Sequence, residues 1–168
     1  MNLTTEILKN YKIFKDINDE DINNFLKIIK ISNVNSNTII AKEGNIEDRL
    51  IFLLEGKCSV SMPLILQSKL LQNDDSVKEV YKASAEDYPV FGEVFLGEAK
   101  ERTANIQTTS KAIIGILEAK DFFMVCNNNT RLGYKLMKNI IDMMCDRFEK
   151  NSKTILKLST AISLLLEK

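Results

Sequence analysis

The chain contains 168 residues, of which 45% are hydrophobic and 27% are charged, a composition typical of one folded globular domain and not of a disordered segment. Its 23 basic and 23 acidic residues give a formal net charge of zero, which argues against the basic surface of a nucleic-acid binder or of a protein that binds anionic membranes. No histidine is present, so the usual Ser–His and Cys–His nucleophile pairs and His-ligated metal sites are excluded, and we expect neither an enzyme nor a metal site.

Residues 1–36 are expected to form an N-terminal helical segment. In the stretch NDEDINNFLKIIK, which spans Asn18–Lys30, apolar side chains recur with the i, i+3, i+4, i+7 spacing of one helix face. These side chains are Ile22, Phe25, Leu26 and Ile29. Asn18 is a suitable N-cap for this helix, and the acidic residues at 19–21 suit the positive end of its dipole. A shorter helix is expected around Thr5–Tyr11.

Residues 37–119 have the pattern of a β domain. Short β-branched or apolar runs between Thr38 and Met62 are broken by EGN and EGK, whose glycines supply the positive φ angles of tight turns. Further strands are expected at Thr103–Ser110 and Ala112–Glu118, and the weakly patterned stretch Pro63–Tyr88 is expected to be a hairpin or a loop excursion. Several short strands at this spacing predict a β-sandwich or barrel.

Residues 120–168 are expected to be helical and to include one long helix. From Met137 to Leu165, core-type positions follow one another at steps of four and three residues without interruption, which is a heptad pattern. The positions are Met137, Ile141, Met144, Phe148, Asn151, Ile155, Leu158, Ile162 and Leu165. A helix of ~30 residues spans ~45 Å, more than a small domain needs for its own core. We therefore expect a homodimer through this seam, with Asn151 fixing its register; the alternative is a helix that folds back along its own β domain.

Arg102 is one of only four arginines among the 23 basic residues of a lysine-rich chain. It lies in the tract FGEVFLGEAKERTANI, beside small and apolar residues that are typical of a segment entering the interior. A planar guanidinium donates to two phosphate oxygens at once, whereas an ammonium acts as a point charge. Arg102 is therefore a candidate anion ligand. The alternative is a structural ion pair with Glu93, Glu98 or Glu101.

The same tract resembles the phosphate-binding cassette of the cyclic nucleotide-binding domain family, which includes the catabolite activator protein and the regulatory subunit of protein kinase A. Gly92-Glu93 and Arg102-Thr103-Ala104 match the family's Gly-Glu, short apolar helix and Arg-small-Ala. In family order, IFKDINDEDINNFLKII looks like the N-terminal helices, NTIIAKEGNIEDRLIFLLEGKCSV like the first hairpins, and ILEAKDFFMV like the strand and helix after the β-roll. The resemblance implies a mainly β fold with flanking helices: a cupin-like double-stranded β-helix, or jelly roll, between N-terminal helices and a long C-terminal helix, with its cassette at 91–104.

The resemblance also implies a set of ligand-binding residues. Arg102 would hold the phosphate, Glu93 would accept from the ribose 2′-hydroxyl, and Gly92 would let the backbone come close. A short helix, Val94–Glu98, would add amide donors, and Arg147 on the long helix would cap the base. The full set is Gly92, Glu93, Val94, Phe95, Arg102, Thr103, Ala104 and Arg147.

Two positions bear on which ligand is bound. Thr103 lies where family members carry a hydroxyl that favours guanine in some and accompanies adenine in others, so both cAMP and cGMP remain candidate ligands. Phe95 stands where the family usually has alanine or glycine close to the sugar. Phe148 and Asn151 lie near the base-capping region but are also seam positions, so core packing in the seam is their expected role and base capping the alternative.

The expected function is cyclic-nucleotide sensing, with the ligand signal passed through the C-terminal helix to an unknown effector protein. The sequence lacks the helix-turn-helix of the family's transcription factors, so we expect a stand-alone domain that binds no nucleic acid. The alternative is a degenerate cyclic nucleotide-binding fold that binds no nucleotide and acts as a dimeric interaction module. The absence of a secretory signal or an apolar run of ~20 residues, with three widely spaced cysteines, indicates a cytoplasmic protein without a membrane anchor.

Overall fold

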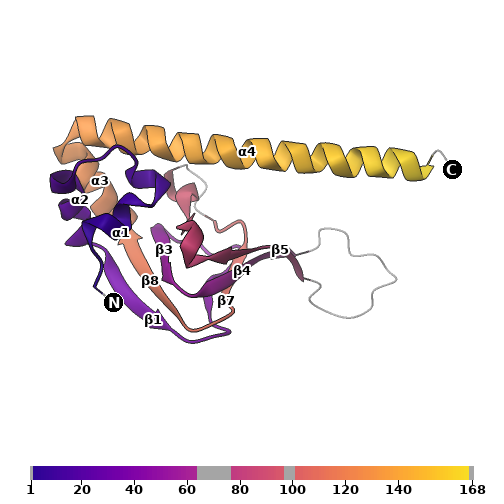
Figure 1. Cartoon of the computed structure of the whole chain (residues 1–168), viewed down its shortest axis with the longest axis horizontal. Coiled ribbons are helices and arrows are strands. Elements are labelled where there is room, and N and C mark those ends of the chain that lie inside the picture. Colours follow the sequence, from indigo (N-terminus) through magenta and orange to yellow (C-terminus); the bar gives the residue numbers. More distant parts are fainter. Residues whose placement is uncertain (1, 64–76, 97–100, 167–168) are drawn as a thin grey trace.

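The computed structural model describes residues 2–63, 77–96 and 101–166. Within these residues, two antiparallel four-stranded sheets pack face to face as a jelly roll, with helices at one end (Figure 1). The first sheet has the strand order β1-β8-β3-β6 and the second sheet β2-β7-β4-β5. The strands are β1 (Lys30–Val34), β2 (Ile39–Ala41), β3 (Arg49–Glu55), β4 (Lys57–Pro63), β5 (Val77–Ser84), β6 (Val90–Phe91), β7 (Asn105–Thr108) and β8 (Ala112–Glu118). The jelly roll expected from the sequence is confirmed.

The α-helices precede and follow the β-roll in the sequence, and short 3₁₀ helices connect some of the other elements. They are α1 (Thr5–Lys9), η1 (Lys12–Phe14), α2 (Asp19–Leu26), η2 (Ala85–Asp87), η3 (Glu93–Leu96), α3 (Ala119–Asn128) and α4 (Thr130–Leu166). Asn18 caps α2 as expected, because its side-chain oxygen accepts from the Asp21 amide at 2.8 Å. The helix is shorter than its apolar period predicted: it ends at Leu26, and Lys30–Val34 pairs with β8 instead. Pairing with a neighbouring strand outweighs the helical pattern there.

The hairpin expected in Pro63–Tyr88 is present at its base. Strands β4 and β5 pair in antiparallel register from Lys57 with Ser84 to Pro63 with Val77. Residues 64–76, which connect them, lie outside the described part of the chain. Strand β7 is shorter than the expected Thr103–Ser110, whereas β8 has the predicted bounds.

The core has two compartments, which β3 separates. Its side chains alternate because successive residues of a strand point to opposite faces. Leu50 and Phe52 join the compartment that packs against the helices, and Ile51 and Leu53 join the one inside the roll. The hydroxyl of buried Tyr11 donates to the Leu53 carbonyl at 2.7 Å and ties the N-terminal segment to the roll.

The three cysteines are free thiols. Cys58 lies in the compartment inside the roll and Cys126 in the one against the helices, and burial raises the pKa of both to about 11. Cys145 is exposed on α4. Two of the thiols therefore act as apolar core side chains.

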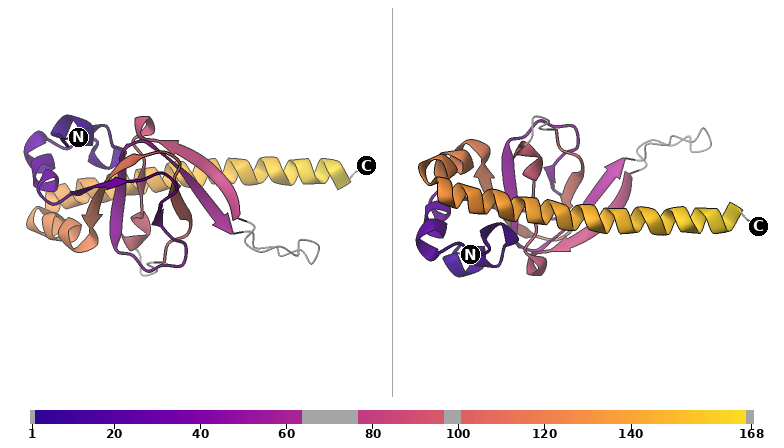
Figure 2. Two further views of the ribbon diagram at one scale, coloured as in Figure 1. Left: turned by 90° about the horizontal axis from the view of Figure 1, so that it is seen from below. Right: turned by 90° about the horizontal axis from the view of Figure 1, so that it is seen from above.

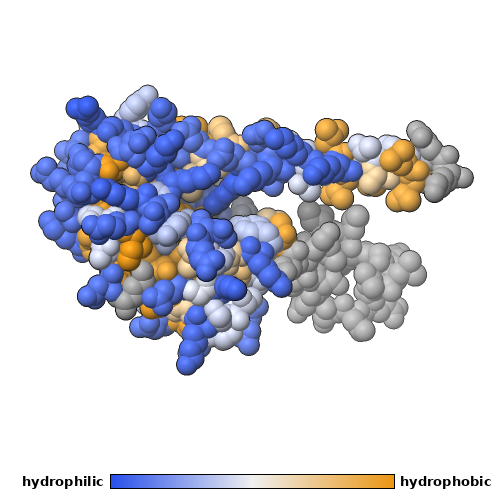
Figure 3. Space-filling view, in the orientation of Figure 1, coloured by the Kyte–Doolittle hydropathy of each residue, from blue (hydrophilic) through white to orange (hydrophobic). Residues whose placement is uncertain are grey.

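Helix α4 has 37 residues and consists of a docked part and a free part. Leu132, Leu136 and Ile140 are buried in the core, whereas every residue of Phe148–Leu166, the distal half, is exposed within the described chain. Figure 2 shows α4 crossing the roll and projecting beyond it, and Figure 3 shows hydrophobic residues near its free end. The distal half of the helix therefore does not fold back along the β domain. No described helix combines the length and hydrophobicity that crossing a membrane requires.

We expect Tyr11→Phe to lower the free energy of unfolding by about 1–3 kcal/mol, because the substitution leaves the buried Leu53 carbonyl without its donor. Urea unfolding followed by circular dichroism measures the change. Tyr134→Phe is the matched control, since Tyr134 is 72% exposed and its loss should cost less than about 0.5 kcal/mol. Equal effects of the two substitutions would contradict a structural role for the Tyr11 hydrogen bond.

Candidate functional site

The cassette tract begins at the end of β6 and returns to the roll at β7. Strand β6 pairs with β3, which places Phe91 beside Ile51. Gly92 then turns the chain with a φ of 99°, and η3 follows at once. Residues 97–100 lie outside the described part of the chain, so the expected helix Val94–Glu98 is seen only as the 3₁₀ turn Glu93–Leu96.

The backbone of Arg102 is held on both sides by the turn between β2 and β3. Its amide donates to the Asn45 carbonyl at 2.8 Å, and its carbonyl accepts from the Gly44 amide at 2.9 Å. Next to it, Glu101 forms an isolated bridge with Ile46. This turn therefore fixes the point from which the arginine side chain starts.

The Arg102 side chain enters the protein, and the residue is only 4% exposed. Its Nε donates to Glu47 Oε2 at 3.1 Å and its Nη2 to the Arg49 carbonyl at 2.9 Å, while Nη1 has no hydrogen-bond partner among the described residues. Burial lowers the pKa of the guanidinium, and the Glu47 carboxylate opposes that shift. Arginine keeps its charge in proteins, so the site holds a buried cation with one unused donor.

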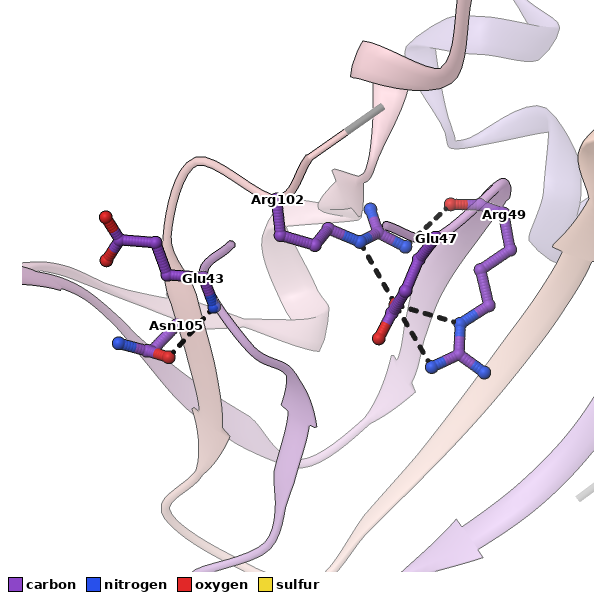
Figure 4. A network of polar contacts seen from close by, with 5 residues as sticks. All are labelled: Glu43, Glu47, Arg49, Arg102 and Asn105. Atoms are coloured by element: carbon purple, nitrogen blue, oxygen red, sulfur yellow. Dashed lines mark hydrogen bonds and ion pairs between the residues drawn. The ribbon is translucent and has the colours of Figure 1, made fainter. Parts of the chain in front are cut away.

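A single carboxylate oxygen joins two arginines at this site. Glu47 Oε2 accepts from Arg102 Nε and also from Arg49, whose Nε and Nη2 lie 3.2 and 3.1 Å away. Figure 4 shows the Glu47 carboxylate between the two guanidinium groups. The sequence predicted Glu93, Glu98 or Glu101 as the alternative, structural partner of Arg102. Among the described residues the side-chain ion-pair partner is Glu47, and Glu98 lies outside them. Arginine is scarce in this chain, and the scarcity that singled out Arg102 could also have pointed to Arg49 as a site residue.

Glu93 and Arg147, both predicted as ligand-binding residues, lie together in the structure. Arg147 Nη1 pairs with Glu93 Oε1, and Arg147 Nη2 donates to the Val90 carbonyl at 2.7 Å. The Glu93 side chain is 17% exposed and that of Arg147 40%. One side chain of α4 thus binds both the strand that leads into the cassette and the first residue of η3.

Comparison with known proteins identifies the architecture. No family model and no curated protein sequence matches the chain. Solved structures do match. A cyclic nucleotide-binding domain from Methylobacillus flagellatus KT superposes with a TM-score of 0.74 at 18% identity, covering 90% of this chain and 79% of that one. The catabolite activator protein of Thermus thermophilus has a TM-score of 0.71 at 15% identity, covering 88% of this chain and 63% of that one.

The regulatory domain of Toxoplasma gondii protein kinase A, solved with cAMP, has a TM-score of 0.65 at 18% identity, covering 84% of this chain and 48% of that one. The chain has the fold of cyclic nucleotide-binding domains. Identities of 15% and 18% establish the cyclic nucleotide-binding fold alone. What the site can bind depends on the residues of this chain.

The other residues predicted for the ligand site lie in the cassette tract or on α4. Ala104 is buried in the compartment inside the roll, and Thr103 is exposed beside it. The side chains of Val94 and Phe95 lie outside the described part of the structure. Phe148 and Asn151 are both exposed on α4, and Phe148 is 75% exposed. The structure thus packs Gly92 closely on Arg102 and pairs Glu93 with Arg147, at successive positions of one cassette.

Gly92→Ala should distort the site. A Cβ at Gly92 would lie 1.9 Å from Arg102 Nη1 and 2.4 Å from the Arg49 carbonyl oxygen. We expect this variant to lose clearly more than the ~1–2 kcal/mol that a left-handed backbone costs a non-glycine residue. Gly44→Ala is the control, because Gly44 has a φ of 75° and no atom within 4 Å of the added Cβ. Urea unfolding compares the two, and a Gly92→Ala loss no larger than that of Gly44→Ala would contradict the close packing of Gly92 on Arg102.

Proposed function

We propose that the chain binds a cyclic nucleotide, cAMP or cGMP, with the ligand phosphate at Arg102. The observation that carries this proposal is the buried Arg102 guanidinium beside Gly92, whose Nη1 has no hydrogen-bond partner among the described residues. A buried charged group with an unused donor is costly unless an anion pairs with it. A phosphodiester offers the charge and the acceptor oxygens that the group lacks.

The surroundings of Arg102 support this choice of ligand. Glu93, the candidate acceptor for the ribose 2′-hydroxyl, follows Gly92 directly and is largely buried. The structurally similar regulatory domain of Toxoplasma gondii protein kinase A was solved with cAMP, which supports a cyclic nucleotide as the ligand. Gly92, Val94, Phe95, Thr103 and Ala104 complete the proposed cassette. We infer a binding role for the chain and no catalytic one.

Arg147 provides a route from the ligand to the long helix. It is the last side chain of α4 with a described contact to the rest of the chain, because Phe148–Leu166 is exposed. A ligand whose ribose hydroxyl binds Glu93 changes the environment of the Glu93–Arg147 pair. The proposed signal is a shift of α4 between two positions, read by an effector protein in the cytoplasm.

Titration calorimetry with cAMP and cGMP tests the ligand. We expect saturable binding to the wild-type chain and a loss of roughly 10- to 100-fold in affinity for Arg102→Ala, since a charge-assisted contact is removed. Arg102→Lys should recover little of that loss, because an ammonium lacks the planar fork. Arg131→Ala, which removes an exposed arginine, is the control and should bind as the wild type does. Absence of binding to either nucleotide would reject the sensor.

One observation favours the alternative function, a dimeric interaction module that has lost nucleotide binding. Arg102 and Glu93 are already engaged, by Glu47 and Arg147 respectively. A site whose charges are paired internally keeps its fold without a ligand. Under this alternative both nucleotides fail to bind, while the dimer described next remains.

The seam of α4 should join two copies of the chain. Ile155 and Ile162 are 67% and 57% exposed, and Leu158 and Leu165 between and after them are 59% and 72% exposed, a continuous apolar stripe with the heptad spacing of a coiled coil. We expect light scattering to give a dimer for the wild type and a monomer for Ile155→Glu/Ile162→Glu. Thr160→Glu places one charge off the seam and should leave the dimer intact. A monomeric wild type at micromolar concentration would remove the dimer from the proposal.

A further inference from the structure

We propose that the ligand phosphate replaces the Glu47 carboxylate between Arg102 and Arg49, so that Arg49 is a second phosphate-binding residue and Glu47 an internal anion that the ligand displaces. This inference rests on the proposed function. It adds two residues that neither the cassette pattern nor the sequence analysis singled out.

The position of Glu47 is that of a bound anion. Three donors from two guanidinium groups converge on its Oε2 at 3.1–3.2 Å. The donors come from separate parts of the chain, Arg102 from the cassette and Arg49 from the start of β3, and both side chains bind this oxygen (Figure 4). A point at which two arginines converge is what a phosphate group requires.

Glu47 does not satisfy the cation that it binds. Arg102 is 4% exposed, and within the described part of the chain its Nη1 still lacks a hydrogen-bond partner. A carboxylate that leaves a buried donor unused is a weaker partner for the arginine than an anion able to reach more of its donors. A phosphodiester that binds more of these donors therefore gains free energy that offsets the loss of the Glu47 contacts.

The local structure lets the carboxylate leave while the arginine stays. Arg102 is held by its backbone hydrogen bonds to the turn and by the Arg49 carbonyl, and none of these contacts involves the Glu47 side chain. Glu47 lies in the turn before β3, outside any strand, and its side chain is 16% exposed. The Arg49 side chain is 32% exposed, against 3% for Arg102. Glu47 and Arg49 can therefore reorient toward solvent and ligand around a fixed Arg102.

Calorimetric titration of cAMP and cGMP into three variants tests the exchange. Glu47→Gln keeps the size of the side chain and removes the competing charge, and it should tighten binding roughly tenfold. Arg49→Gln removes the second cation and should weaken binding roughly tenfold, in the wild type and in the Glu47→Gln background alike. Asp87→Asn removes an exposed carboxylate in η2 and should leave the affinity unchanged, which separates a local effect from a change in overall charge.

The outcomes separate this inference from the proposed function. Wild-type binding that Glu47→Gln weakens or leaves unchanged overturns the inference alone, and a weakening as large as that of Arg102→Ala would make Glu47 a positioning residue. Binding that appears only in Glu47→Gln would reject sensing by the wild type and support the exchange of the Glu47 carboxylate for phosphate. If neither the wild type nor Glu47→Gln binds cAMP or cGMP, the proposed function and the inference are both rejected.

A second measurement needs no substitution at Glu47. The four arginines of the chain give few Nε–H signals in a ¹H–¹⁵N spectrum, and Arg→Lys variants assign them. On addition of cAMP or cGMP, we expect the signals of both Arg102 and Arg49 to shift, while that of exposed Arg131 stays in place. A shift of Arg102 without Arg49 would contradict the two-arginine site even if Glu47→Gln did not fold.

Discussion

The Arg102 guanidinium is buried beside Glu47, and much of the surrounding structure can be understood as what that burial requires. A cation removed from water needs a counter-charge and hydrogen-bond acceptors, which Glu47 and the Arg49 carbonyl supply. It also needs room, which Gly92 provides because any Cβ there would meet Nη1. The turn between β2 and β3 fixes its backbone. Two segments far apart in the sequence, the stretch 44–49 and the cassette, thus meet at one side chain.

The same cassette links the β-roll to the long helix. Gly92 faces Arg102, and the next residue, Glu93, pairs with Arg147 of α4. Residues 132, 136 and 140 anchor the beginning of the helix in the core, and Arg147 makes its last described contact before the exposed distal half begins. A change at the cassette therefore acts on the helix at the point where it leaves the domain. Under the proposed function, this position is the route by which ligand binding would reach the exposed distal half of α4.

Local side-chain patterns predicted several helices and strands correctly, and they failed where pairing with a distant segment determines the structure. The N-cap at Asn18, strand β8 and the long C-terminal helix follow from side-chain spacing, and the structure has all three. The end of α2 does not follow: Ile29 continues the apolar period, but the helix stops at Leu26 because the next residues form β1 and pair with β8. Strand pairing is a non-local interaction that periodicity in a single segment does not contain.

The candidate site also combines residues that the sequence predicts with contacts that only the fold creates. From the sequence by itself, the rarity of arginine singled out Arg102, and the resemblance to a family motif predicted that Gly92 and Glu93 share a cassette with it. The same resemblance selected Arg147 on the long helix. Only the tertiary structure decided that Glu47 holds Arg102, that Arg49 shares the same oxygen, and that Glu93 is bound by Arg147. The physical reason is that an ion pair depends on which charges the fold brings within a few ångströms, and residues 47 and 102 approach only after the β2–β3 turn packs on the cassette.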